Sequence, residues 1–98
     1  KIIIMPHNPI DVIYPQNRIS HVVEVLHDGT VNEPNEFSIA RIQLNNGVIV
    51  NGIRYNMNEW NEDNPDIGYP TCRPGNPTWF ILPEIEDLLP VLNNVFKV

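Results

Sequence analysis

The sequence predicts an α+β fold, in which a mainly antiparallel sheet of four to five strands carries one C-terminal helix packed on one face. Three observations support this class. Asn45, Asn46 and Gly47 separate two strand-like runs, FSIARIQL and VIVNGIRY. Residues 78–82, TWFIL, are typical of a further strand. Beyond Pro83, acidic residues precede leucines at helical spacing, which indicates an amphipathic helix.

The central hairpin is predicted to turn on Asn46 and Gly47 as a two-residue type I′ turn, because both tolerate the positive φ angles it requires. Counting outward from this turn places Arg41 opposite Gly52. Arg41 and Arg54 are then diagonal neighbours on the face turned away from the core, about 7 to 8 Å apart at the backbone. The opposite, mostly apolar face is expected to meet the core.

The N-terminal residues 1–18 contain three prolines, which predicts an extended arm with a short edge strand at 2–5. Residues 19–27 follow as an imperfectly alternating strand, with both faces half-buried. A strict alternation gives one face of this strand Ile19, His21, Val23, Val25 and His27. Asp28 and Gly29 indicate a turn after it.

A long irregular loop is predicted over 56–77, which holds four prolines and two glycines. In the strand that follows, Trp79 and Ile81 share one face, and core packing is the simplest role for Trp79. Pro90 predicts a kink or break in the terminal helix, because proline lacks a backbone donor. The whole chain, 1–98, is interpreted as a single domain.

Composition restricts the partners. The formal net charge is -6 and only six residues are Lys or Arg, so a nucleic acid is not expected as a partner. The single Cys72 cannot form an internal disulfide, which favours a reducing compartment. The apolar run at 2–5 is too short for a membrane span or a signal-peptide core, so we expect a soluble cytoplasmic protein without a membrane partner.

Three arginines are the sharpest candidates for a ligand site. Arg41 and Arg54, joined by Arg73 from the long loop, are suited to hold a carboxylate or phosphate, which guanidinium binds in a bidentate manner. The alternative is that each arginine pairs with a nearby acid from a loop or a second subunit.

Other candidate binding residues lie in the long loop. Trp60 stands in a polar context, either as a lid over the loop or as an anchor for a partner. Tyr69 is a second large aromatic there. Cys72 beside Arg73 is either a thiolate stabilised by positive charge or an inert, partly buried thiol.

Catalytic and metal motifs are not found in the sequence. His21 and His27 lie six residues apart, roughly 20 Å along a strand, without a third ligand at zinc spacing. We therefore predict neither catalytic residues nor a metal or other cofactor, and the chain is interpreted as more suited to binding than to catalysis.

Four stretches carry a family resemblance. They are GIRYN at Gly52–Asn56, PTWFILP at Pro77–Pro83, TCRPGN before it, and VEVLHDGTV at Val23–Val31. Together they resemble a pattern in small uncharacterised bacterial proteins, some carried on phage or integron gene cassettes, with no assigned activity. The resemblance extends over about Val23 to Leu89 and departs from the pattern at Cys72 and Pro74. It implies one α+β domain and no particular function.

Three functions follow as hypotheses. The first is a small acidic binding or protein-interaction module that forms a homodimer or binds another protein. The second is a protein that binds an anionic small molecule, or a modest enzyme, using Arg41, Arg54 and Arg73. The third is an acidic inhibitor or antitoxin-like protein, suggested by net charge.

Overall fold

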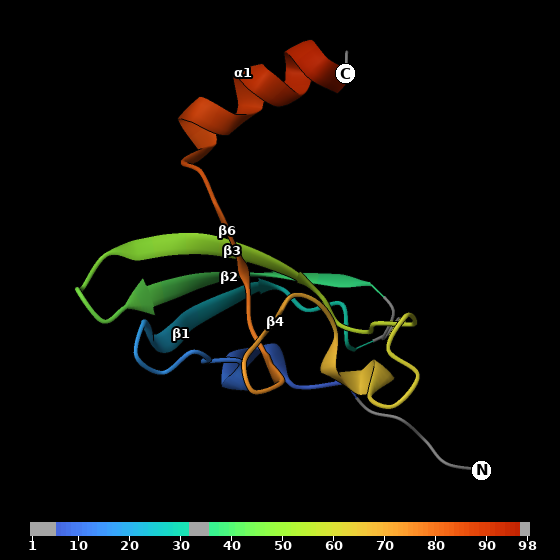
Figure 1. Ribbon diagram of the computed structural model, residues 1–98. Coiled ribbons are helices and arrows are strands. Elements are labelled where there is room, and N and C mark those ends of the chain that lie inside the picture. The colour runs from blue at the N-terminus through green and yellow to red at the C-terminus, as the bar shows by residue number, and fades with distance from the viewer. Residues whose placement is uncertain (1–5, 32–35, 97–98) are drawn as a thin grey trace.

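The computed structural model describes residues 6–31 and 36–96. Four strands form one antiparallel sheet in the order β1-β2-β3-β6 (Figure 1). Their bounds are Ile19–His27 for β1, Phe37–Leu44 for β2, Ile49–Tyr55 for β3 and Phe80–Leu82 for β6. The smaller elements are the 3₁₀ helices η1 (Pro9–Asp11) and η2 (Pro65–Ile67), the paired strands β4 (Thr71–Cys72) and β5 (Asn76–Pro77), and the helix α1 (Ile85–Phe96). The predicted α+β class is confirmed, while the expected edge strand at 2–5 lies outside the described residues.

The β2–β3 hairpin turns through three residues rather than two. The amide of Gly47 donates to the carbonyl of Leu44 at 2.9 Å, and the amide of Leu44 donates to the carbonyl of Val48 at 2.8 Å. Gly47 has a φ of 88°. This is the three-residue loop in which a β-turn is followed by a left-handed glycine. The predicted two-residue turn is therefore wrong, and the register is shifted by one residue.

The shifted register exchanges the faces on which several side chains lie. Ser38 lies opposite Arg54 and Ala40 opposite Gly52, and all four are buried. We call this buried side of the sheet the inner face. The opposite side is the outer face, on which β2 and β3 place four cross-strand pairs: Phe37 with Tyr55, Ile39 with Ile53, Arg41 with Asn51, and Gln43 with Ile49. Strand β6 adds Phe80 opposite Ile53 and Leu82 opposite Asn51.

Strand β1 does not alternate as predicted. Its register against β2 shifts three times, between Ile19 and His21, between Val22 and Glu24, and between Val25 and His27. Each shift inserts one extra residue, so the inward positions recur every third residue instead of every second. Ile19 and Val22 are buried and Val25 is half-buried, whereas Val23 is exposed. The predicted face shared by Val23 and Val25 is therefore wrong.

The core lies between the inner face and irregular chain beneath it. Figure 1 shows η1 and η2 on this side of the sheet. Val12 of the N-terminal arm and Trp79 complete a cluster with inward residues of β1 and β2. The indole of Trp79 donates to the carbonyl of Val12 at 2.8 Å, and the hydroxyl of Thr78 donates to the carbonyl of Tyr14 at 2.6 Å. The predicted core role of Trp79 is confirmed.

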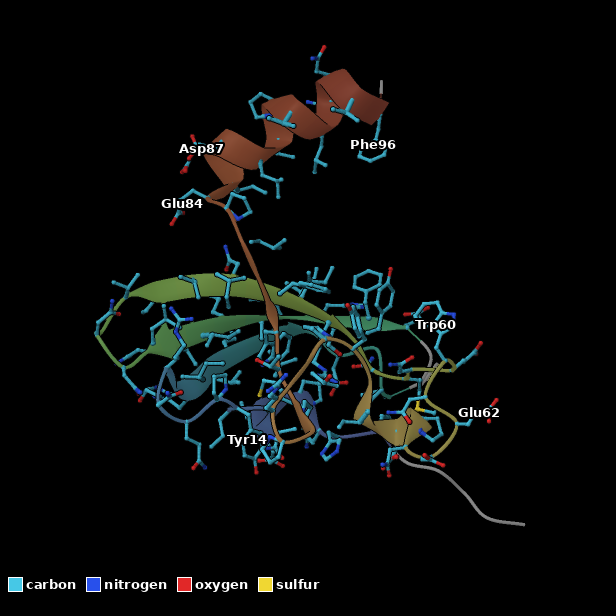
Figure 2. All side chains as sticks on the ribbon, viewed as in Figure 1. Tyr14, Trp60, Glu62, Glu84, Asp87 and Phe96 are labelled. Carbon is cyan, nitrogen blue, oxygen red and sulfur yellow. The ribbon has the colours of Figure 1, made fainter. Side chains whose placement is uncertain are left out.

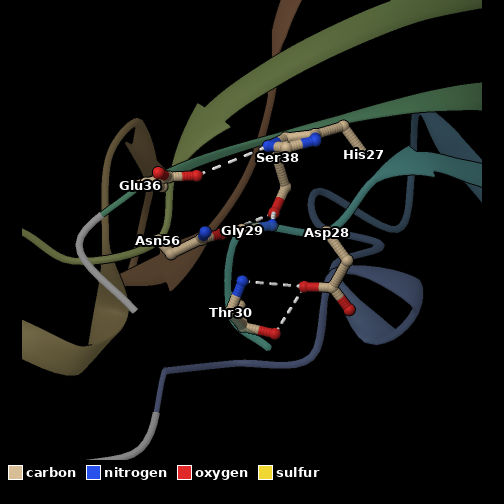
Figure 3. Close-up of polar contacts among 7 residues, drawn as sticks. All are labelled: His27, Asp28, Gly29, Thr30, Glu36, Ser38 and Asn56. Carbon is tan, nitrogen blue, oxygen red and sulfur yellow. Dashed lines mark hydrogen bonds and ion pairs between the residues drawn. The ribbon is translucent and has the colours of Figure 1, made fainter. Parts of the chain in front are cut away.

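A buried polar cluster fixes one end of the inner face (Figure 3). The hydroxyl of Ser38 donates to Oδ1 of Asn56 at 2.8 Å, and the amide of Gly29 donates to that hydroxyl at 3.2 Å. Asp28 accepts a hydrogen bond from the amide of Thr30 at 2.9 Å, which closes the predicted turn. These contacts tie the start of the long loop to the turn that follows β1.

Helix α1 is not packed on a sheet face, contrary to the prediction. None of its residues is buried, and Figure 1 shows it standing away from the sheet, on the side opposite η1 and η2. The helix also continues through Pro90 to Phe96, so the predicted break is absent. Irregular chain, rather than this helix, covers the inner face.

Candidate functional site

The outer face is an apolar surface that the fold leaves open. Phe37, Tyr55 and Phe80 each remain about two-fifths to one-half exposed, at 39%, 52% and 45%. Ile39, Ile53 and Leu82 lie among them and are half-buried. Residues that lie opposite each other in neighbouring antiparallel strands have adjacent side chains, so this set forms one continuous surface.

Aromatic side chains form a hollow in this surface. Phe37, Ile53, Tyr55 and Phe80, with Arg54, line a cavity of about 220 Å³. Tyr69 borders it, because its ring meets the ring of Phe80 edge to face at 5.5 Å between centroids. The backbones of Tyr55 and Tyr69 exchange two hydrogen bonds, of 2.8 and 3.0 Å, and so extend the sheet beside β6. Of the predicted site residues, Tyr69 thus lies at the outer face.

Arg54 lies on the inner face and is 2% exposed. Its guanidinium donates to the backbone carbonyls of Ile67 and Thr78 and lies over the ring of Trp79, 6.0 Å from the centroid. Burial lowers the pKa of Arg54 from its ordinary value to about 10, so the group stays charged at neutral pH. The side chain fastens the long loop to the sheet and is not directed toward an open ligand site.

The contact between Arg54 and the loop restricts position 68 to glycine. Gly68 has a φ of 70° and a ψ of -159°, a conformation found almost only in glycine. A Cβ at this position would stand 2.3 Å from a guanidinium nitrogen of Arg54 and 2.3 Å from the carbonyl oxygen of Tyr55. Glycine is therefore required for the loop to approach the arginine.

The three predicted arginines do not meet. Arg41 is exposed on the outer face, opposite Asn51, while Arg54 is buried on the inner face. Arg73 is exposed beside the β4–β5 turn. The expected proximity of Arg41 and Arg54 on one face is wrong, because it depended on the two-residue turn.

Trp60 projects from the long loop into solvent. It is 83% exposed, and Figure 2 shows it at one end of the molecule together with Glu62. Hydrogen bonds within the loop hold this segment: the Asn58 amide donates to the carbonyl of Pro65 at 2.8 Å, and Oδ1 of Asn58 accepts from the Trp60 amide at 3.1 Å. The indole does not fold over the loop, which leaves the anchor as the alternative compatible with its exposure.

Cys72 lies in a second hollow, on the other side of the sheet. The cavity measures about 390 Å³ and is lined mainly by apolar side chains. Its lining residues are Pro15, Arg18, Ile19, Leu44, Cys72, Thr78, Trp79 and Ile81. Cys72 and Arg73 also line a shallow surface hollow at the β4–β5 turn, so the pair is accessible but separate from the outer face.

Within residues 6–31 and 36–96, no three His, Cys, Asp or Glu side chains are grouped so as to hold a metal ion. No helix in this part of the chain combines the length and apolar character needed to cross a membrane.

Comparisons with known proteins give no counterpart: no protein-family model, curated protein or solved structure matches the chain.

Sequence reasoning missed the aromatic character of the outer face. The predicted two-residue turn places Arg54 on the open side, and the same counting places its neighbour Tyr55 on the core side. The signal that could have corrected this is the Asn45-Asn46-Gly47 run itself, because the same three residues also suit a three-residue loop. That loop brings Phe37, Ile53 and Tyr55 together.

Replacing Arg54 with Met keeps much of the side-chain length but removes both hydrogen bonds to the loop. We expect the free energy of unfolding to fall by about 2–4 kcal/mol, because two carbonyl oxygens lose their donor in a buried setting. Arg41→Met is the matched control, expected to change it by no more than about 0.5 kcal/mol because Arg41 is exposed. Urea denaturation measures both, and equal losses would contradict the assigned role.

Replacing Gly68 with Ala combines backbone strain with a collision, whereas Gly47→Ala introduces strain alone. Gly47 also has a positive φ, but a Cβ there would meet no atom within 4 Å. We expect Gly47→Ala to lower the free energy of unfolding by about 1 kcal/mol and Gly68→Ala by about 2–4 kcal/mol. Thermal unfolding followed by circular dichroism measures the difference, and an equally mild effect at both sites would show that the loop does not need the close approach.

Proposed function

We propose that this chain is a protein-interaction module that self-associates through the outer face of its sheet. The observation that carries the proposal is the set of aromatic and aliphatic side chains left exposed there: Phe37, Tyr55 and Phe80 around the half-buried Ile53. Aromatic residues in a shallow apolar hollow supply much of the binding energy in protein interfaces.

The numbers of buried and exposed apolar residues support the same interpretation. Seven apolar residues form the buried core of the described chain, while seventeen large apolar residues remain exposed. Single exposed apolar side chains are ordinary on protein surfaces, but a continuous patch marks an interaction site. The outer face has this continuity, since its apolar residues occupy adjacent positions on three paired strands.

The anionic-ligand hypothesis has less support, because it depended on a shared site for Arg41, Arg54 and Arg73. Arg54 is occupied by the carbonyls of Ile67 and Thr78. Arg41 and Arg73 remain exposed but lie on different elements. A protein partner that covers apolar surface fits the observed distribution of side chains better than a small anion does.

Self-association is tested by light scattering coupled to size exclusion, with Phe80→Glu as the disrupting variant. We expect the unaltered chain to be a dimer at tens of micromolar. The variant should raise the dimer Kd by about 30-fold or more, because an interface that buries an unpaired carboxylate loses roughly 2 kcal/mol or more.

Ile10→Glu is the matched control, since Ile10 is 42% exposed in η1, away from the outer face. It should leave the dimer unchanged. A strict monomer at several hundred micromolar, or equal loss of dimer in both variants, would end the proposal.

A further inference from the structure

Helix α1 has a broad apolar side that no other element of the described residues, 6–31 and 36–96, buries. Ile85 and Leu89 are about half exposed, and Phe96 is 68% exposed. On a helical projection, these residues and Leu88, Leu92 and Val95 fall on one side, while Glu86, Asp87 and Asn94 fall on the other. An amphipathic helix of this kind depends on burial of its apolar side for most of its stability.

The connection between β6 and α1 keeps this helix away from its own sheet. Only Pro83 and Glu84 separate the two elements. Proline fixes its own φ and restricts the preceding residue, here Leu82, to extended backbone. The strand therefore runs straight out of the sheet before the helix begins, as Figure 1 shows.

We propose that the apolar side of α1 packs on the outer face of a second copy of this chain, with the second copy's helix returning the contact. This inference rests on the self-association proposed above and specifies its geometry. Each copy supplies one unpartnered helix and one unpartnered sheet face, so a single two-fold axis satisfies both surfaces and closes the assembly at two copies.

The dimensions of the two surfaces agree. A helix of twelve residues is about 18 Å long, and the seven residues of β3 extend for about 23 Å. A helix of about 10 Å diameter covers roughly two strands at their spacing of about 4.8 Å. One helix therefore covers β3 and a neighbouring strand, where Ile53 and Phe80 lie.

Charge favours the same pairing. Glu84 immediately precedes α1, where the chain enters the helix (Figure 2). Arg41 is exposed on the outer face and has no ion-pair partner among residues 6–31 and 36–96. A helix laid on the partner's sheet brings this carboxylate within reach of Arg41.

Disulfide trapping tests the contact directly, in a Cys72→Ser background that removes the natural thiol. Ile53→Cys and Leu89→Cys are made in separate chains and mixed under mild oxidation. We expect a covalent heterodimer that forms faster than random collision between the two thiols allows. A chain carrying both cysteines should give covalent dimers; a covalently closed monomer at every concentration would place the helix on its own sheet and overturn the proposal.

Asn94→Cys is the matched control for the trap, because Asn94 lies on the polar side of α1. It should cross-link to Ile53→Cys at least about tenfold more slowly than Leu89→Cys, since its side chain faces away from the partner sheet. Equal rates for the two helix positions would show random collision and overturn the proposal.

The two proposals fail in different ways. Leu89→Glu in the full chain should raise the dimer Kd by about 30-fold or more, whereas Asn94→Glu should leave it within about threefold. A dimer that tolerates Leu89→Glu but is broken by Phe80→Glu would overturn helix exchange and leave self-association in place. A chain that is monomeric without any substitution would overturn both.

Discussion

The buried guanidinium of Arg54 is the contact on which the rest of the structure depends. The segment beneath the inner face is too irregular to supply hydrogen-bond donors for all its own carbonyl groups. It directs the carbonyls of Ile67 and Thr78 inward, toward Arg54. A planar cation with several donors satisfies both at once and packs its flat side against Trp79. Burial costs this charge part of its hydration, which is the physical cause of its lowered pKa. Because the cation fastens the loop there, the inner face is already occupied and α1 is left outside.

This division gives the sheet two different sides. The inner side is closed by chain without regular secondary structure, through Val12, Trp79 and the polar cluster of Ser38 and Asn56. The outer side retains aromatic and aliphatic residues that nothing in the described part of the same chain buries. The apolar side of α1, at the end of a stiff two-residue connection, is the second surface that stays exposed. Incomplete burial of both surfaces in one copy is the reason for proposing a second copy as the partner.

Much of the fold was predictable, because turn chemistry and apolar runs located β2, β3, β6 and α1 closely, and placed Trp79 in the core. The register was not, since Asn45-Asn46-Gly47 suits turns of two or three residues. Hydrophobic pattern usually settles such a choice, but here the inward positions hold Ser38, Gly52 and Arg54, which appear polar or neutral in sequence. The predicted arginine site was wrong for the same reason, because it depended on that register. The position of α1 was unpredictable for another reason: an apolar helix side indicates burial without indicating whose surface buries it.

The three irregularities of β1 have a consequence for how copies of this molecule can meet. A regular strand at the border of a sheet presents evenly spaced amides and carbonyls, to which another chain can add in register. Here the extra residues after Ile19, Val22 and Val25 interrupt that spacing along the whole border, and an incoming strand would find no continuous row of partners. Growth into fibrils from this edge is therefore discouraged by backbone geometry alone, even though the outer face of the same sheet is apolar and exposed.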